Sequence, residues 1–220
     1  MITKLFQTRR MIWLILLYGL LLTAFHLDYM AVFVDEAYHV VMGRQLLRGE
    51  ACPGCPFSSG WVYIHPITAA AADAVGGIYA VRGMNIILGL LLVLCVFITA
   101  KRLFNEKIGV IAAAILMFSG QTPYLMRLGT YDMMAAFLLG CSFMIIAIST
   151  TEEMAGRRRA LTLIGGMLLL FFAAVSKYLL PSFVPAIGLW ALYKHRFSRA
   201  MMFSIFMLAG MAALFWFFAP

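Results

Sequence analysis

The sequence predicts an all-α fold, a polytopic transmembrane helical bundle with surface helices in its first outer loop. Of its 220 residues, 64% are hydrophobic and only 12% are charged, roughly half the charged share of an ordinary soluble domain. The apolar residues also gather in runs close to the ~20 residues that a helix needs to cross a bilayer. We therefore expect one transmembrane domain over residues 1–220 and no separate soluble domain.

Each apolar run is interpreted as one crossing. The stretch 161–193 is too long for a single crossing and is divided at Ser176 and Lys177, ahead of two prolines. No small-residue cleavage site follows the first run, so it is not expected to be a signal peptide. The last run ends at Pro220 without a polar flank, which predicts a chain truncated at its C-terminus. The expected crossings are residues 11–28, 84–103, 108–125, 131–149, 161–175, 179–193 and 200–218.

The basic residues predict the orientation of these crossings. Region 64–81 is rich in alanine, contains Asp73 and is only weakly apolar. If it lies at the membrane surface, most of the 17 basic residues fall on the inner side, as the positive-inside rule requires. If it crosses, the basic clusters at 101–107 and 157–159 move outside. We therefore expect a multi-pass cell-membrane protein with a cytoplasmic N-terminus, and an outer loop 29–83 that carries two interfacial helices.

This orientation also accounts for the net charge of +8 without nucleic acid as a partner. Membrane lipids are the expected surroundings. The first surface helix is predicted from Asp35 to Arg48, because it opens with acidic residues, closes with basic ones and stops at Gly49.

Ionisable side chains from separate parts of the chain share one predicted depth, at the outer rim. An ionisable group in hydrocarbon costs about 2.5–3.5 kcal/mol on insertion scales, so each one needs a reason. A carboxylate can act as a general base on a hydroxyl, and cations can stabilise a leaving phosphate. The candidates are Asp35, Glu36, His65, Arg127, Asp132 and Lys177.

Each candidate also has a purely structural interpretation. Asp35 and Glu36 are favourable charges at a helix N-terminus, and Asp132 can have the same role. Arg127 and Lys177 can extend to lipid headgroups. His65, before a proline, can be an ordinary loop residue. Their shared depth is what favours a functional site over these alternatives.

The cysteines predict packing and a local disulfide. Cys52 and Cys55 lie in the outer loop, where an oxidising compartment favours a disulfide. No second pair completes a zinc site, so no metal site is predicted, although a divalent cation as cofactor is left open. Cys95 and Cys141 fall inside crossings and are interpreted as small packing residues.

Several segments, in order, resemble GT-C glycosyltransferases of the protein O-mannosyltransferase and aminoarabinose-transferase type. Residues 34–38 and 43–49 resemble the first outer loop of that family, and residues 63–66 resemble its surface-helix start. The resemblance continues through 82–104, 109–119 and 127–132 to Ser176 and Lys177, and covers about residues 11–193. Two positions depart from the family pattern: His65 stands where lysine is usual, and Tyr178 where glycine is usual.

The resemblance implies an enzyme that takes a sugar from a polyprenyl-phosphate donor at the outer face. The acceptor would be a hydroxyl on a lipid, a glycan or a protein. Asp35 would be the catalytic acid with Glu36 beside it, and Asp132 a second acid. Lys177, Arg127 and His65 would contact the donor phosphate.

Two other classes of function stay open. A transporter or flippase would place paired charges or broken helices near the midplane, whereas the charges here are predicted at the outer surface. A non-catalytic fragment or assembly partner is the other alternative, because the sequence stops abruptly at Pro220.

Overall fold

The computed structural model describes residues 2–25, 27–28, 31–50, 64–151 and 156–177, and all regular structure in these ranges is helical. The predicted all-α fold is therefore confirmed. The predicted crossings 179–193 and 200–218 and the pair Cys52 and Cys55 lie outside the described residues. The helices are α1 (Ile2–Ala24), α2 (Val34–Leu47), α3 (Ile64–Leu103), α4 (Glu106–Phe118), α5 (Gln121–Arg127), α6 (Tyr131–Thr151) and α7 (Gly156–Ser176).

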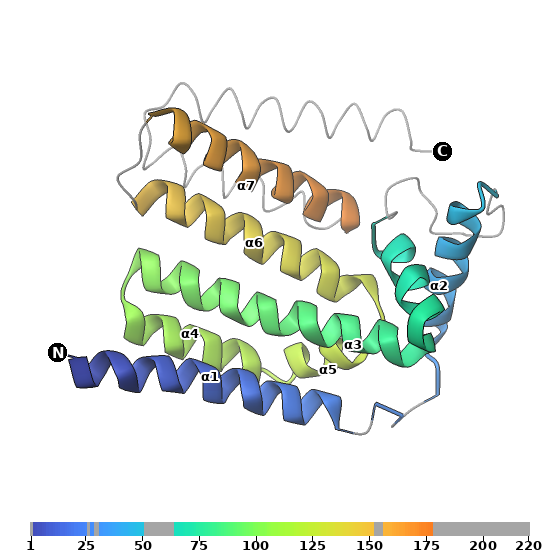
Figure 1. Cartoon of the computed structure of the whole chain (residues 1–220), viewed down its shortest axis with the longest axis horizontal. Coiled ribbons are helices and arrows are strands. Elements are labelled where there is room, and N and C mark those ends of the chain that lie inside the picture. Colours follow the sequence, from blue (N-terminus) through green and yellow to red (C-terminus); the bar gives the residue numbers. More distant parts are fainter. Residues whose placement is uncertain (1, 26, 29–30, 51–63, 152–155, 178–220) are drawn as a thin grey trace.

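The long helices lie side by side in a bundle (Figure 1). The axes of α1, the long part of α3, α4, α6 and α7 are roughly aligned, with chain directions that differ from helix to helix. α2 and the first turns of α3 cross these helices at one end of the bundle. Short turns make this arrangement possible. Between α3 and α4, the side chain of Asn105 accepts a hydrogen bond from the backbone N–H of Ile108 at 3.1 Å, which caps the start of α4.

α3 is divided by a break at Gly76 and Gly77. Gly77 has φ 63° and ψ −159°, a conformation that a side chain strongly disfavours. Ala69, before the break, and Val81, after it, both pack in one cluster with Val40 of α2. The segment expected to lie on the membrane surface is thus a separate helical piece up to the break, and its placement relative to a bilayer stays a prediction.

α2 and α3 approach each other closely at Gly43. A Cβ atom added there would lie 1.9 Å from the carbonyl oxygen of Pro66, so only glycine fits. This contact fixes α2 against the start of α3. Both helices contribute candidate residues, and the close approach holds those residues in register.

The crossing expected at 108–125 is not a straight helix. α4 and α5 together are apolar enough to span a membrane, but they are bent by 61° at the break between them. Gly120 in this break has φ 76°, which ends α4 and reorients the chain. The α5 helix therefore lies close to the start of α6.

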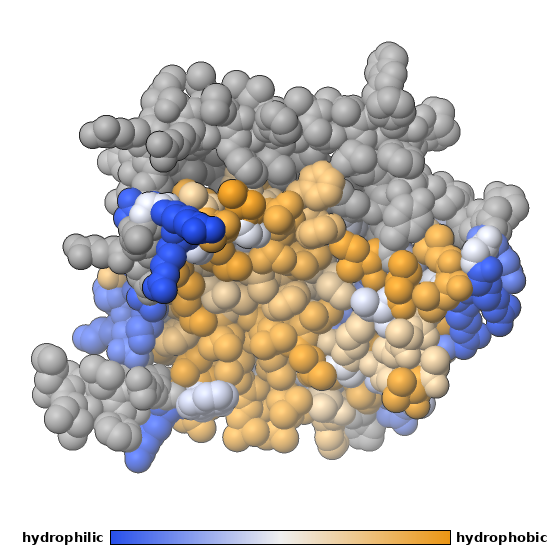
Figure 2. Space-filling model, turned by 45° about the horizontal axis from the view of Figure 1, so that its top comes forward, coloured by the Kyte–Doolittle hydropathy of each residue, from blue (hydrophilic) through white to orange (hydrophobic). Residues whose placement is uncertain are grey.

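By length and composition, α3 and α6 could each cross a membrane, and the bent α4–α5 pair would make a third span. Residues Arg10–Ala24 of α1 form a shorter apolar helix. Figure 2 shows a broad hydrophobic surface over the middle of the bundle with hydrophilic side chains towards its two ends. An apolar belt between polar ends is the surface expected of a helical membrane bundle.

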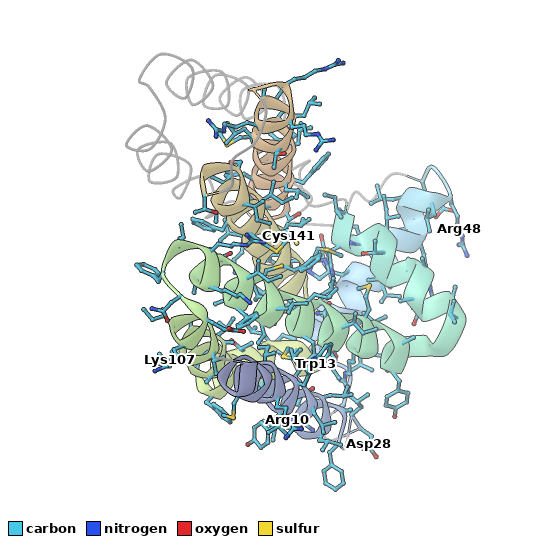
Figure 3. All side chains as sticks on the ribbon, turned by 60° about the vertical axis from the view of Figure 1, so that its left-hand side comes forward. Arg10, Trp13, Asp28, Arg48, Lys107 and Cys141 are labelled. Carbon is cyan, nitrogen blue, oxygen red and sulfur yellow. The ribbon has the colours of Figure 1, made fainter. Side chains whose placement is uncertain are left out.

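The largest core cluster joins α1, α3, α4, α5 and α6, with Val93, Ala113 and Met117 fully buried. Cys95 on α3 and Cys141 on α6 face each other with 3.6 Å between their sulfur atoms, as free thiols. Figure 3 shows Cys141 within the bundle, whereas Lys107 and Arg48 lie on opposite sides of the molecule. Cys95 and Cys141 therefore pack against each other between α3 and α6.

Candidate functional site

The candidate residues come together at one end of the bundle. α1 ends there, α2 and the first turns of α3 lie across it, the α5–α6 turn faces it, and α7 ends at it (Figure 1). The basic residues that end α3 and open α4 and α7 lie at the opposite end. Residues far apart in the sequence therefore share one rim of the molecule.

Glu36 is a fully buried junction between three parts of the chain. Its exposed fraction is 0%, and that of its partner Arg82 is 1%. Glu36 Oε1 accepts from Arg82 Nε at 3.0 Å and from the backbone N–H of Gly129 at 2.6 Å. Glu36 Oε2 accepts from Arg82 NH2 at 2.8 Å and from the backbone N–H of Phe33 at 2.9 Å. Both carboxylate oxygens are thus engaged within the fold.

These contacts keep Glu36 ionised. Burial raises the pKa of Glu36, but the hydrogen bonds from Arg82, Gly129 and Phe33, with the charge of Arg82, outweigh burial and bring the pKa below its usual 4.5. A carboxylate with all its lone pairs occupied is a poor proton acceptor for a substrate. Glu36 is therefore placed to hold the first turn of α2 in position.

Arg82 and Asn85 extend this junction. Arg82 also donates to the carbonyl oxygen of Leu27 and, at 3.2 Å, to that of Ala31. Fully buried Asn85, one turn further along α3, donates to the carbonyl oxygens of Leu128 and Thr130. Together the two side chains attach the α1–α2 connection and the α5–α6 turn to α3.

Asp132 and Lys177 form an ion pair across α6 and the end of α7. Lys177 Nζ donates to Asp132 Oδ1, and both side chains are about a quarter exposed, at 28% and 25%. Lys177 Nζ also lies 5.6 Å from the centre of the Tyr131 ring, a cation–π contact. The hydroxyl of Thr130 donates to Asp132 Oδ2 at 3.3 Å. A cation and a carboxylate that water can reach are thus held together.

His39 of α2 lies at the centre of an aromatic cluster. Its ring centre lies 5.2 Å from that of His65 and 5.0 Å from that of Tyr131, both edge to face. Burial lowers the pKa of His39 below 6.5, although the charges of Asp35 and Asp132 oppose the shift. His39 is therefore neutral near pH 7, and both candidate carboxylates lie close enough to act on it.

The other candidates are placed as follows. Asp35 is exposed in the first turn of α2. His65 is fully buried, and its Nε2 lies 2.9 Å from the carbonyl oxygen of Gly129. Arg127 at the end of α5 donates to the carbonyl oxygen of Phe25 at 3.0 Å.

The structure therefore joins His65, His39, Tyr131, Lys177 and Asp132 in one chain of contacts, and Asp35 lies one helical turn before His39 on α2. Glu36 lies behind this group, and the contact of Arg127 is with the end of α1. Sequence reasoning missed His39, Arg82, Asn85 and Tyr131 as site residues. A signal existed for His39, which follows Asp35 by four residues and so shares its helix face.

In the described parts of the chain, no three His, Cys, Asp or Glu side chains are arranged to hold a metal ion. The chemistry available from these parts is that of a carboxylate base, an ammonium group and neutral imidazoles. Those groups suit the transfer of a group from a phosphate leaving group to a hydroxyl.

Comparison with protein-family models matches residues 66–220 to the dolichyl-phosphate-mannose-protein mannosyltransferase family. The chain belongs to this family, and membership implies a membrane glycosyltransferase of the GT-C type. A comparison with curated proteins found no match, and a comparison with solved structures found none either. The resemblance noted from the sequence is thereby confirmed at the level of the family.

Proposed function

We propose that the protein transfers a sugar from a polyprenyl-phosphate donor to a hydroxyl of a lipid, glycan or protein at the outer membrane face. The observation that carries this proposal is the Asp132–Lys177 ion pair at the end of the bundle across which α2, with Asp35 in its first turn, lies. The pair supplies a cation for a phosphate, and Asp35 supplies an exposed carboxylate within the same group of residues.

In the proposed reaction, the Asp35 carboxylate accepts the proton of the acceptor hydroxyl. The acceptor oxygen forms a bond to the anomeric carbon as the bond from that carbon to the phosphate oxygen breaks. The bonding electron pair leaves with the polyprenyl phosphate. Lys177 exchanges part of its contact with Asp132 for the phosphate and stabilises the charge that develops there. Arg127 is the second proposed phosphate contact.

Glu36 has a positioning role in this scheme. It is adjacent to Asp35 but is held by Arg82, Gly129 and Phe33, so it fixes the helix turn that presents Asp35. His65 differs from the lysine that the family usually has at its position. Its contact with the carbonyl oxygen of Gly129 requires a donor, which is a structural use of one ring nitrogen.

The test is transfer of radiolabelled sugar from polyprenyl phosphate by the purified chain in lipid nanodiscs. Asp35→Asn should lower the transfer rate at least about 100-fold, the usual loss for a general base. Asp73→Asn is the matched control, because Asp73 pairs with Arg44 elsewhere on α2 and α3. Unchanged transfer by Asp35→Asn would remove the proposed base.

Lipid transport is a second candidate, favoured by the 61° break between α4 and α5. Broken helices are common where transporters bind their substrates. Flipping of fluorescent polyprenyl phosphate in proteoliposomes, without sugar transfer, would favour this second function over the first.

A further inference from the structure

Two buried histidines carry ring nitrogens without a protein partner. His39 is 5% exposed and His65 is 0% exposed. Neither Nδ1 atom has a hydrogen-bond partner within the described parts of the chain. Buried polar atoms are nearly always hydrogen-bonded, so each exception calls for an explanation such as a bound ligand.

The protonation of His65 follows from its other nitrogen. Nε2 of His65 lies 2.9 Å from the carbonyl oxygen of Gly129, and a carbonyl oxygen only accepts. Nε2 therefore carries the hydrogen. A second hydrogen on Nδ1 would make a buried cation without a partner, which is strongly disfavoured. Nδ1 of His65 is thus an acceptor with an unused lone pair.

The surroundings define what such an acceptor would bind. The His39 and His65 rings are in edge-to-face contact, and Tyr131 joins them to the Lys177 ammonium group. The charged groups that face His39 are Asp35 and Asp132. A neutral acceptor lone pair suits an O–H donor, whereas it repels the oxygens of a phosphate. A ligand with both a phosphate and hydroxyl groups would therefore place its phosphate at Lys177 and its hydroxyls at the imidazoles.

We propose that His39 and His65 are specificity-determining residues that hydrogen-bond hydroxyl groups of the donor sugar through Nδ1, with His65 as the acceptor. This inference rests on the proposed lipid-phosphate-sugar donor. It deepens that proposal, since it assigns the sugar half of the donor to the imidazoles and the phosphate half to Lys177. The two imidazoles are binding groups here and take no proton from the acceptor.

The two ring nitrogens of His65 can be tested separately. In His65→Gln, the amide can take the place of Nε2 and still donate to Gly129, but the Nδ1 acceptor is lost. In His65→Asn, the amide oxygen can replace the Nδ1 acceptor, but the contact with Gly129 is lost. His39→Phe and His39→Asn make a second pair, in which phenylalanine keeps the ring contacts and asparagine keeps an acceptor.

The experiment measures equilibrium binding of two probes to the full chain in nanodiscs. The probes are dolichyl phosphate mannose and dolichyl phosphate without sugar. His65→Gln and His39→Phe should weaken binding of the sugar-bearing lipid about fivefold to tenfold, as expected for one lost hydrogen bond. Both should leave dolichyl phosphate within about twofold of wild type. The asparagine variants should retain most of the affinity, and Lys177→Met should weaken both probes.

Three results would overturn the inference. Equal weakening of both probes by His65→Gln would place its effect on the phosphate or on the fold. Unchanged affinity for both probes would mean that the Nδ1 atoms bind only water. Binding of neither probe by the wild-type chain would remove the proposed donor, and the inference with it, a result distinct from the first two.

Discussion

The buried Glu36–Arg82 ion pair is predicted to be a major source of stability in the described part of the chain. Glu36 is fully buried and accepts four hydrogen bonds, and Arg82 is 1% exposed. Glu36→Ala would leave the guanidinium buried without its counter-charge. Removing one partner of such a pair costs about 3–5 kcal/mol, because an uncompensated charge stays in the interior.

The same two helices provide an internal control for this prediction. Arg44 on α2 pairs with Asp73 on α3; the Asp73 side chain is 11% exposed, but its partner Arg44 is 56% exposed, so the pair is open to water. Solvent screening limits exposed pairs to about 0–1 kcal/mol. Asp73→Ala should therefore change the free energy of unfolding by no more than about 1 kcal/mol.

The assay is reversible unfolding in mixed micelles, followed by helical circular dichroism as the denaturing detergent is increased. A double-mutant cycle with Glu36→Gln and Arg82→Met should give a coupling free energy of about 1–3 kcal/mol. If Glu36→Ala costs less than about 1 kcal/mol, or if Asp73→Ala costs as much, the buried junction does not have the role assigned to it.

Three further predictions concern packing, backbone and pH. Gly43→Ala should destabilise the fold by at least about 1–3 kcal/mol, because its Cβ would collide with the carbonyl of Pro66, whereas Gly83→Ala, which meets open space, should not. Gly77→Ala should cost about 1–3 kcal/mol through its left-handed backbone, measured against the same Gly83 control. Stability should fall as pH drops below 6.5, because the unfolded chain protonates His39 while the folded chain resists this. The dependence of the unfolding midpoint on pH should be weaker in His39→Phe than in the wild type. An unchanged dependence on pH would show that His39 is not its source.

The long helices could be predicted because each contains an apolar run, which length and hydropathy identify directly, and α2 could be predicted from its acidic start and its stop at Gly49. The breaks were harder to see. The sequence predicted one crossing over 108–125, but Gly120 adopts a positive φ and separates α4 from α5. Gly76 and Gly77 likewise divide α3 within the segment expected to lie at the surface. From the sequence alone, a glycine that allows close helix packing cannot be distinguished from a glycine that interrupts a helix.

The site was predictable to the extent that it depends on sequence-local signals. Asp35, Asp132 and Lys177 were expected because the predicted crossings place all three at one depth, the outer rim. The partnership of Glu36 with Arg82, 46 residues away, depends on how α2 and α3 cross. His39 was missed although it shares a helix face with Asp35, because that spacing alone does not show what the face contacts. The approach of His65 and Tyr131 from other helices is what distinguishes it.

Asp35 and Glu36 are neighbours with opposite surroundings, one exposed and one enclosed. Successive residues of an α-helix point about 100° apart, a consequence of 3.6 residues per turn. Adding one residue directly after Glu36 would therefore turn Glu36 to the exposed orientation of Asp35 and leave the anchoring position without its carboxylate. The position of each acid along this short helix, more than the composition of the helix, determines which carboxylate is held by Arg82 and which one water reaches.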